Sequence, residues 1–351
     1  MLDYLVVGLG LAGVSFCETL ENNNKSFVVV TDHSQVASMV AGGLYNPVLL
    51  KRFTLAWNAK EQLRIAMPFY AGLEKKLDVP LDHKVPILRR FASIAEQNLW
   101  FEAADKPELQ PFLSTQIISN TNMAVDAPYG YGRVLGTGRV DTEKLVAVYA
   151  AYLLAKNVLI KKTFVVNDLE IRDDGIRYNS VRARHIVFTD GYGLKNNPYF
   201  NYLPLNGTKG ELLTIKAPDL KEKSVLKSAV FCIPLGDDLY RVGATYKWKD
   251  KTNIPTAEAR SELLQKLDAL ITCDYEVVDH VAGIRPTVTD RRPLVGRHPE
   301  NDAMYVLNGF GSRGVMTAPF ASHQLYQYIE NKGQLHQEMD ITRFTVKYFK
   351  K

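Results

Sequence analysis

Apolar residues near the start of the chain form short runs that are separated by glycines and polar residues. The run Tyr4-Leu5-Val6-Val7 leads directly into glycines 8, 10 and 13, and a second run over 27–31 ends on Asp32. Between them, Val14–Glu21 has the spacing of a helix. Two short apolar runs joined by a helix are typical of a parallel βαβ unit. The pattern predicts a strand, a tight turn, a helix and a second strand over the first 32 residues.

The same periodicities continue along the chain. Helices are predicted over Thr54–Leu77 with a break near Pro68, over Lys144–Lys156 with Asp141 or Thr142 as its cap, over Thr256–Leu270, and in a last segment ending near Asn331. Strands are predicted over 85–92, 115–125, 158–166, 169–171, 176–178, 184–189, 211–216, 229–234 and 239–246. Gly132–Arg139, which is rich in glycine, is predicted as a turn region.

The glycines after the first strand have the spacing Gly-x-Gly-x-x-Gly of a dinucleotide-binding loop. Gly8 allows the turn, Gly10 lets the backbone approach a pyrophosphate, and Gly13 lets the helix pack closely on the strand. The helix N-terminus offers free N–H groups to phosphate. Asp32 can accept hydrogen bonds from both ribose hydroxyls and would repel a 2′-phosphate. The motif therefore predicts NAD or FAD and argues against NADP.

A second glycine-rich loop lies in the C-terminal quarter. The apolar run 304–307 leads into Asn308-Gly309-Phe310-Gly311-Ser312-Arg313-Gly314, and an amphipathic helix follows. Backbone N–H groups and the positive end of a helix dipole would again point toward a common position, where an anion could bind. From the residues alone, this segment is either a second anion-binding site or one more strand-to-helix turn of the same sheet.

The composition limits the class of protein and the cellular compartment that we expect. A length of 351 residues, with 46% hydrophobic and 23% charged residues, indicates an ordinary globular protein of two domains. The net charge of +5 is spread out, which favours a solvated surface over a nucleic-acid footprint. The cysteines at 17, 232 and 273 form no CxxC pair, so we expect a reducing compartment, no disulfide and no metal site. Without a signal peptide or a long apolar stretch, we expect a cytoplasmic protein.

The order and spacing of the motifs at both ends of the chain resemble the FAD-dependent oxidoreductases of the D-amino-acid oxidase superfamily. Glycine oxidases, sarcosine oxidases and the flavin domain of a tRNA-modifying enzyme belong to this group. The shared features are the first glycine loop, the loop Ala41-Gly42-Gly43-Leu44, the segment Gly283-Ile284-Arg285-Pro286 with Pro293-Leu294-Val295-Gly296, and the second glycine loop ending at Ala318-Pro319. Residues 51–134 and 205–280 are less diagnostic.

This resemblance implies a set of residues that hold FAD. Gly8, Gly10 and Gly13 would hold the pyrophosphate, and Asp32 the adenosine ribose. The residues expected against the flavin ring are Ala41, Gly42 and Gly43, with Val165 or Val166 on the adenine side. Those expected around the pyrimidine edge of the flavin are Gly311, Ser312, Arg313, Gly314 and Val315. There they would stabilise the negative charge that develops on reduction.

The resemblance also implies how a substrate is held. Arg285 matches the arginine that pairs with the substrate carboxylate in the amino-acid-oxidising members, a task suited to its planar fork. Tyr246 is the second candidate catalytic residue, and with Tyr45 and His280 it is a candidate for the pocket wall. Ordinary packing is the alternative for these three side chains. No residue is assigned as a general base.

We therefore predict an α/β fold in which a Rossmann-like FAD-binding domain is interwoven with a substrate domain built on an antiparallel sheet. The predicted FAD-binding domain comprises 1–50, 135–203 and 281–351, and the substrate domain comprises 51–134 and 204–280.

The predicted reaction is oxidation of a C–N bond in a small amine or amino acid, with hydride transfer to flavin N5 and hydrolysis of the resulting imine. The alternative is a flavoenzyme that acts on a carboxymethylaminomethyl-uridine-type base of tRNA, which the Gly-Ser-Arg-Gly loop at 311–314 and the positive charge favour. A nucleotide-binding protein without redox chemistry is a third class, but it would leave Arg285 without a purpose.

Overall fold

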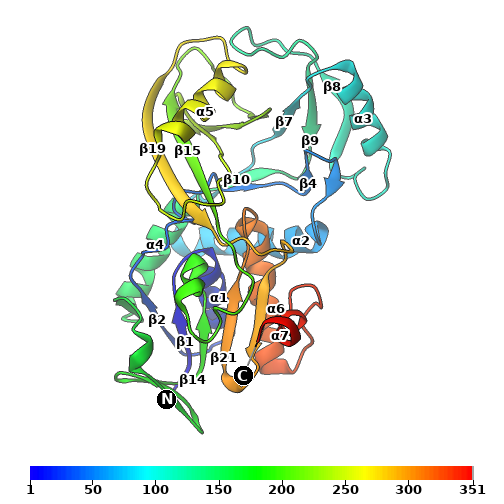
Figure 1. Cartoon of the computed structure of the whole chain (residues 1–351). Helices are drawn as coiled ribbons and strands as arrows, with labels where there is room; N and C mark the ends of the chain where they lie inside the picture. Colours follow the sequence, from blue (N-terminus) through cyan, green and yellow to red (C-terminus); the bar gives the residue numbers. More distant parts are fainter. Residues whose placement is uncertain (350–351) are drawn as a thin grey trace.

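Two large sheets, each in its own lobe, organise the chain, and the long helix α2 (Ala59–Leu77) lies between them (Figure 1). The computed structural model describes residues 1–349. The first strand and the last helix of the described chain, Thr342–Tyr348, both lie in the lower lobe of the figure, although the chain passes through the upper lobe in between. The lobes are therefore joined by several crossings of the chain.

The lower lobe is built on a mainly parallel sheet. Its parallel strands run in the order β11 (Leu159–Lys161), β2 (Phe27–Thr31), β1 (Leu2–Val7), β14 (Val181–Phe188) and β21 (Asn301–Asn308). Antiparallel neighbours are β12 (Leu169–Arg172), β13 (Gly175–Tyr178) and β20 (Leu294–His298). The helices of this lobe are α1 (Leu11–Asn22), α4 (Thr142–Ala155), α6 (Gly314–Asn331) and α7 (Thr342–Tyr348). The parallel strands are apolar because both faces of such a sheet are covered.

The upper lobe is built on a curved sheet whose neighbouring strands are antiparallel, except for the pair β7 and β16. Its order is β19 (Glu276–Arg285), β15 (Thr208–Lys216), β18 (Leu239–Gly243), β17 (Phe231–Gly236), β16 (Val225–Lys227), β7 (Ile87–Arg90), β9 (Tyr131–Val134) and β8 (Leu113–Ile118). The helices α3 (Ile94–Ala104) and α5 (Ala257–Asp268) cover it.

Short elements connect the two lobes. The strand β10 (Gly138–Val140) pairs with β3 (Leu44–Tyr45) and β6 (Asp82–His83), while β4 (Val48–Leu49) pairs with β5 (Thr54–Leu55). Short 3-10 helices occur at Val166–Asp168 and Gly191–Asn196. No helix within residues 1–349 has both the length and the apolar character that a bilayer crossing requires.

The helix α2 and helices of the lower lobe share one apolar core with the lower sheet. Phe16 of α1, Tyr70 of α2 and Tyr149 of α4 are all fully buried in it. The Tyr70 hydroxyl donates to the carbonyl of Val315, 2.8 Å away, at the start of α6. The core thus fixes the first turn of α6, where the second glycine loop ends.

The α/β fold class predicted from the sequence is confirmed, but several elements differ. Gly132–Arg139 is not a turn region, because its residues form parts of β9 and β10. The helix predicted from Thr54 starts at Ala59, since Thr54 and Leu55 pair with β4, and it continues through Pro68. The strand predicted over 158–166 is limited to β11.

The predicted domain boundaries stay a prediction. The strand β19 runs to Arg285 within the upper sheet and crosses the predicted boundary at residue 281. Arg285 therefore stands at the end of an upper-lobe strand that points toward the lower lobe (Figure 1).

Candidate active site

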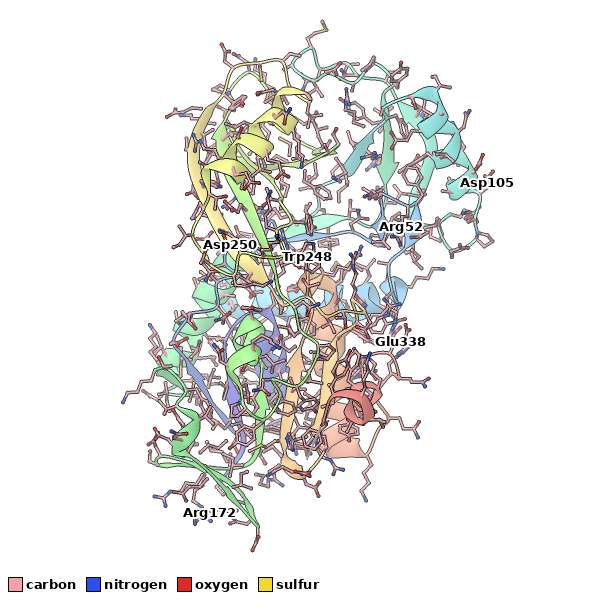
Figure 2. All side chains as sticks on the ribbon, in the orientation of Figure 1. Arg52, Asp105, Arg172, Trp248, Asp250 and Glu338 are labelled. Atoms are coloured by element: carbon pink, nitrogen blue, oxygen red, sulfur yellow. The ribbon has the colours of Figure 1, made fainter. Side chains whose placement is uncertain are left out.

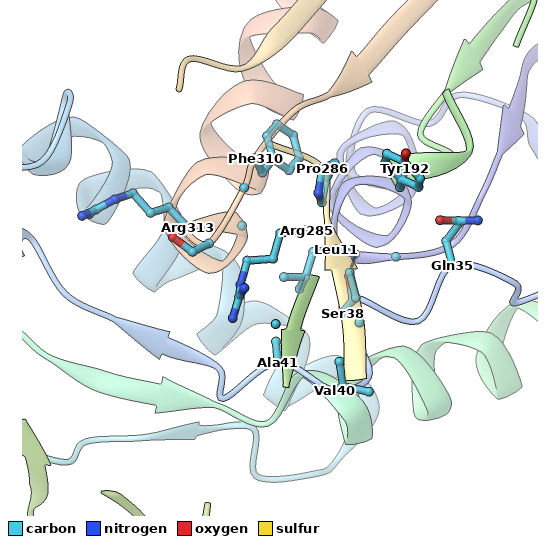
Figure 3. Close-up of a pocket in the computed structure, with 18 of the residues that line it drawn as sticks. Leu11, Gln35, Ser38, Val40, Ala41, Tyr192, Arg285, Pro286, Phe310 and Arg313 are labelled. Atoms are coloured by element: carbon cyan, nitrogen blue, oxygen red, sulfur yellow. Dashed lines mark hydrogen bonds between the residues drawn. The ribbon is translucent and has the colours of Figure 1, made fainter. Parts of the chain in front are cut away.

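A cavity of about 1020 Å³ lies where the two lobes meet. Both glycine loops of the lower lobe line it, together with the loop after β2 and the strand ends of the upper sheet. Figure 3 shows Leu11, Ser38, Pro286, Phe310 and Arg285 around this cavity. Segments from the two ends of the chain therefore form one continuous wall.

The first glycine loop joins β1 to α1 in a strained turn. Gly8 has a φ of +99°, which only glycine adopts readily, and a side chain there would also meet the carbonyl of Thr189. A Cβ on Gly13 would lie 2.3 Å from the Gly8 carbonyl oxygen, so α1 packs against the loop as closely as glycine allows. The N-terminus of α1 consequently faces the cavity, as a phosphate-binding loop requires.

Asp32 follows the last residue of β2 and lines the same cavity. Its Oδ1 accepts a hydrogen bond from the Ser34 backbone N–H at 2.9 Å. Burial raises the pKa of Asp32, but hydrogen bonds from Ser34 and Thr163 outweigh it and hold the pKa below its ordinary value. The residue is thus a carboxylate that can accept hydroxyl donors.

The loop that contains Ala41, Gly42 and Gly43 passes between the two sheets. Gly43 has a φ of +69°, and a Cβ there would lie 1.9 Å from the Val140 carbonyl oxygen. A Cβ on Gly42 would lie 2.8 Å from Cδ1 of Ile233 in the upper sheet. The two glycines therefore let the chain run between the lobes along the cavity wall.

The second glycine loop leads into α6, whose first residue is Gly314. Arg313 precedes it, and its Nη1 donates to the carbonyl of Asn46 at 3.4 Å. Burial lowers the pKa of Arg313, and Tyr246 opposes this effect. Arginine stays protonated in proteins, so Arg313 brings a positive charge to this wall.

Arg285 extends from the end of β19 into the cavity toward Ala41 (Figure 3). Its guanidinium lies over Gly210, where an added Cβ would be 2.0 Å from Nη2. Nη1 donates to the Thr245 carbonyl at 3.2 Å, and the Tyr246 ring covers the guanidinium. Burial lowers the pKa of Arg285, and Tyr246 opposes the shift. Among residues 1–349, no carboxylate forms an ion pair with Arg285.

The segment that carries Tyr246 is tied to β15. Lys247 exchanges both backbone hydrogen bonds with Lys209, at 2.9 and 3.0 Å. The fully buried Lys209 ammonium donates to Asp250 Oδ2 at 2.5 Å and lies 3.5 Å from Glu211. Trp248 and Asp250 lie near the junction of the lobes (Figure 2). These contacts hold Tyr246 in place beside Arg285.

The structure brings most residues of the predicted site together. Those that line the cavity are Gly8, Gly10, Asp32, Ala41, Gly42, Gly43, Val166, Tyr246, Arg285, Gly311, Ser312, Arg313, Gly314 and Val315. Gly13 lies behind the loop instead, and Val165 points to solvent with 46% of its surface exposed. Tyr45 is buried and donates to Asp82 at 2.9 Å, and His280 Nε2 lies 3.0 Å from Glu211. Neither of the two lines this cavity. The individual roles stay predictions.

Sequence reasoning missed several residues of the cavity, among them Ser38, Asp190 and Lys227. Ser38 Oγ accepts from the Leu11 N–H at 3.0 Å and so occupies one free donor of α1. Asp190 is partly buried beside the first glycine loop and accepts from Asn308 Nδ2 at 3.1 Å. Lys227 lines the far end of the cavity. Asp190 ends a predicted strand and could have been found by the reasoning that identified Asp32, whereas the other two carry no local signal.

These residues fit FAD. The two glycine loops, at opposite ends of the chain, face one cavity, and Gly8 and Gly43 stand where a side chain would collide with backbone. A carboxylate at the end of β2 and positive charge at the start of α6 lie along the same cavity. This combination defines the class of protein as a two-lobed dinucleotide-dependent enzyme.

The sequence profile of the FAD dependent oxidoreductase family matches residues 3–327. The chain belongs to this family, which confirms the resemblance to the D-amino-acid oxidase superfamily and FAD as the cofactor.

Glycine oxidases and a bifunctional tRNA-modifying protein are among the relatives of this chain. Glycine oxidase from Pseudomonas aeruginosa is 29% identical over 341 residues, covering 90% of this chain and 91% of that protein. Glycine oxidase from Bacillus subtilis is 27% identical, covering 58% of this chain and 60% of that protein. The tRNA 5-methylaminomethyl-2-thiouridine biosynthesis bifunctional protein MnmC from Marinobacter nauticus is 22% identical, covering 92% of this chain and 54% of that protein. The chain thus spans about half of the bifunctional protein.

The fold is shared with a solved glycine oxidase from Bacillus cereus. The TM-score is 0.79 at 20% identity, and the match covers 96% of this chain and 97% of that chain. This agreement confirms the fold, including the interwoven arrangement of a mainly parallel and a mainly antiparallel sheet.

Proposed function

We propose that this FAD-dependent oxidoreductase oxidises the C–N bond of a small amine that carries a carboxylate, such as an amino acid. The observation that carries the proposal is Arg285, a partly buried guanidinium in the cavity without a carboxylate partner. Buried charges are normally paired, so this one calls for an anionic ligand. The glycine oxidases among the relatives and the family membership support the same class of substrate.

Arg285 binds and orients the substrate in this proposal. Its planar guanidinium can donate two parallel hydrogen bonds to a carboxylate, which fixes the rotation of the bound molecule as well as its position. Tyr246 covers one face of the guanidinium, and Gly210 leaves room for it on the other side. FAD, when bound, supplies the two-electron acceptor. The protein's own residues therefore act mainly by positioning the substrate and by excluding water.

The residues of the second glycine loop would complete the electrostatic side of the site. Arg313 and the N-terminus of α6 place positive charge along the cavity wall. Such fixed charge favours a state in which negative charge develops nearby, without the cost of reorganising solvent. The substrate amine must be neutral for the carbon next to its nitrogen to give up a hydride, and no side chain of the cavity is assigned as the base that removes the proton from the nitrogen.

The test is anaerobic reduction of the bound flavin by a panel of amines and amino acids. We expect carboxylate-bearing amines to bleach the flavin absorbance. Arg285→Ala should then lower kcat/KM roughly 30- to 5,000-fold, corresponding to about 2–5 kcal/mol, because a buried charge pair is left half-made, and Arg285→Lys should be intermediate. Flavin content should stay normal in both variants. Equal rates in wild type and Arg285→Ala would remove the proposed role of this arginine.

The second candidate is oxidation of a modified base in tRNA. Arg313 in the Gly-Ser-Arg-Gly loop and the exposed aromatic rings of Tyr246 and Trp248 near the cavity favour it. A salt series separates the candidates, because phosphate contacts release counterions and make tRNA turnover fall steeply with ionic strength. Turnover of a small amino acid should depend little on salt.

A further inference from the structure

The cavity extends beyond Arg285 along the inner face of the upper sheet. Four neighbouring strands each contribute one lining residue: Leu212 of β15, Gly243 of β18, Phe231 of β17 and Lys227 of β16. In this order, each residue lies directly opposite the next in the strand register. Residues that lie opposite each other in this way place their side chains on one face of a sheet. The row forms a continuous floor from β15, the strand under the Arg285 guanidinium, to Lys227.

Lys227 is a partly buried cation at the far end of this floor. Its Nζ donates to the Ser228 carbonyl at 2.7 Å and lies 4.5 Å from the centre of the Phe231 ring. An ammonium group has three donors, so further donors remain for a ligand. Burial, followed by the charges of Arg89 and Lys266, lowers the pKa of Lys227 to about 8. The two neighbouring cations thus oppose the charge of Lys227.

The neighbouring cations already have partners. Arg89 pairs with Glu96 at 2.5 Å, and Lys266 pairs with Glu262 at 2.6 Å. Lys227, in contrast, forms no ion pair with any carboxylate in the described part of the chain. Arg52 also lines the cavity but is exposed, where water solvates its charge (Figure 2). Local charge is therefore unbalanced at Lys227.

We propose that Lys227 binds a second carboxylate of the substrate, at the end opposite the carboxylate that Arg285 binds. This inference rests on the proposed function and narrows its substrate class to amino acids, or N-substituted amino acids, with an acidic group at the far end of the molecule.

The length and polarity of this floor predict the part of the substrate that joins its two acidic groups. Three strand spacings separate β15 from β16, roughly 14 Å of sheet. The lysine side chain bridges part of this distance. Leu212 and Phe231 offer an apolar surface between the two cations, so the intervening part of the substrate should be a linear chain of several methylene groups rather than a polar one.

The test measures binding without any oxidation. Linear dicarboxylates from succinate to suberate, and monocarboxylates of the same chain length, are titrated by calorimetry into the FAD-loaded protein. We expect the best dicarboxylate to bind roughly 10- to 100-fold more tightly than its monocarboxylate, the range for a hydrogen bond to a charged group. Lys227→Met should abolish this preference and leave monocarboxylate binding unchanged.

Lys223→Met is the matched control. Lys223 lies on the same segment and is exposed, so its replacement changes the net charge equally without altering the cavity. Lys227→Gln serves as a second variant, and flavin content reports folding. A dicarboxylate preference that survives in a folded Lys227 variant, or is absent in wild type, overturns the inference.

Flavin reduction separates this inference from the proposed function. Amino acids with a terminal carboxylate should have a higher kcat/KM than equally long ones without it, and only Lys227 variants should lose that difference. If no amine reduces the flavin although the dicarboxylate preference is present, the proposed oxidation is wrong and the anion site stands.

Discussion

The guanidinium carbon of Arg285 lies 4.5 Å from the centre of the Tyr246 ring. The two residues come from different parts of the upper lobe, since Arg285 ends β19 and Tyr246 follows β18. The ring covers the guanidinium and is itself 58% exposed. Both side chains line the cavity, so a substrate in the cavity can contact either of them. A cation over an aromatic face is attracted by the ring electrons.

Replacing Tyr246 by Ala should therefore weaken substrate capture. We expect kcat/KM for flavin reduction to fall about 3- to 30-fold, corresponding to about 0.5–2 kcal/mol for this interaction, while Tyr246→Phe keeps most of the activity. Trp248→Ala is a suitable control, because Trp248 lies on the same segment, is half exposed and does not line the cavity. If Tyr246→Phe loses as much as Tyr246→Ala, the hydroxyl rather than the ring is the active part.

Asp32→Ala should weaken FAD binding without unfolding the protein. A carboxylate that accepts ribose hydroxyls contributes about 1.5–3 kcal/mol, so the dissociation constant of FAD should rise roughly 10- to 150-fold. Flavin fluorescence during titration of cofactor-free protein measures this constant. Asp174→Ala, which removes an exposed carboxylate on the outer hairpin, controls for the change in charge. An unchanged constant would show that another group binds the ribose.

Asp190 should make stability depend on pH. Desolvation by burial raises its pKa to about 7, although hydrogen bonds from Asn197 and Asn308 oppose the shift. Because the folded-state pKa lies above the unfolded one, the folded protein holds a proton that the unfolded chain releases near pH 4. This contribution to stability is present in full below pH 4 and is lost as the pH rises to about 7.

Asp190→Asn should remove that dependence. Denaturant unfolding of the cofactor-free protein between pH 4 and 8 measures it. We expect the free energy of unfolding of the wild type, relative to that of the variant, to fall with rising pH by up to about 4 kcal/mol. Parallel curves for the two proteins would contradict the assignment.

Local patterns predicted the lower lobe well because its elements are determined by contacts that are close in sequence. Gly8, Gly10 and Gly13 lie within one turn, and Asp141 caps α4 as expected by accepting from the Lys144 N–H at 3.2 Å. The glycines at 132 and 138 misled the same reasoning. Gly132 lies in the strand β9, where the Trp100 ring packs so closely that a Cβ would be 2.5 Å away. A glycine is needed there for packing and not for a turn.

The site was only partly predictable for a related reason. Arg285 could be assigned through the family resemblance, because its position follows a recognisable segment. Lys227 could not, since its importance depends on the pairing of β16, β17, β18 and β15, which brings together residues up to 31 positions apart in the chain. No local pattern in the sequence records such pairing.

The two glycine loops are far apart in the chain, which affects when the cofactor site can form during synthesis. β1 lies between β2 and β14 in the sheet, and α1 packs against α6, whose first residue is Gly314. A nascent chain emerges from its N-terminus, so the first loop is exposed long before its counterpart has been synthesised. The cofactor cradle is complete only when nearly the whole chain is available. FAD capture therefore requires that both loops have been synthesised, and until α6 is available the apolar face of α1 lacks the helix that buries it.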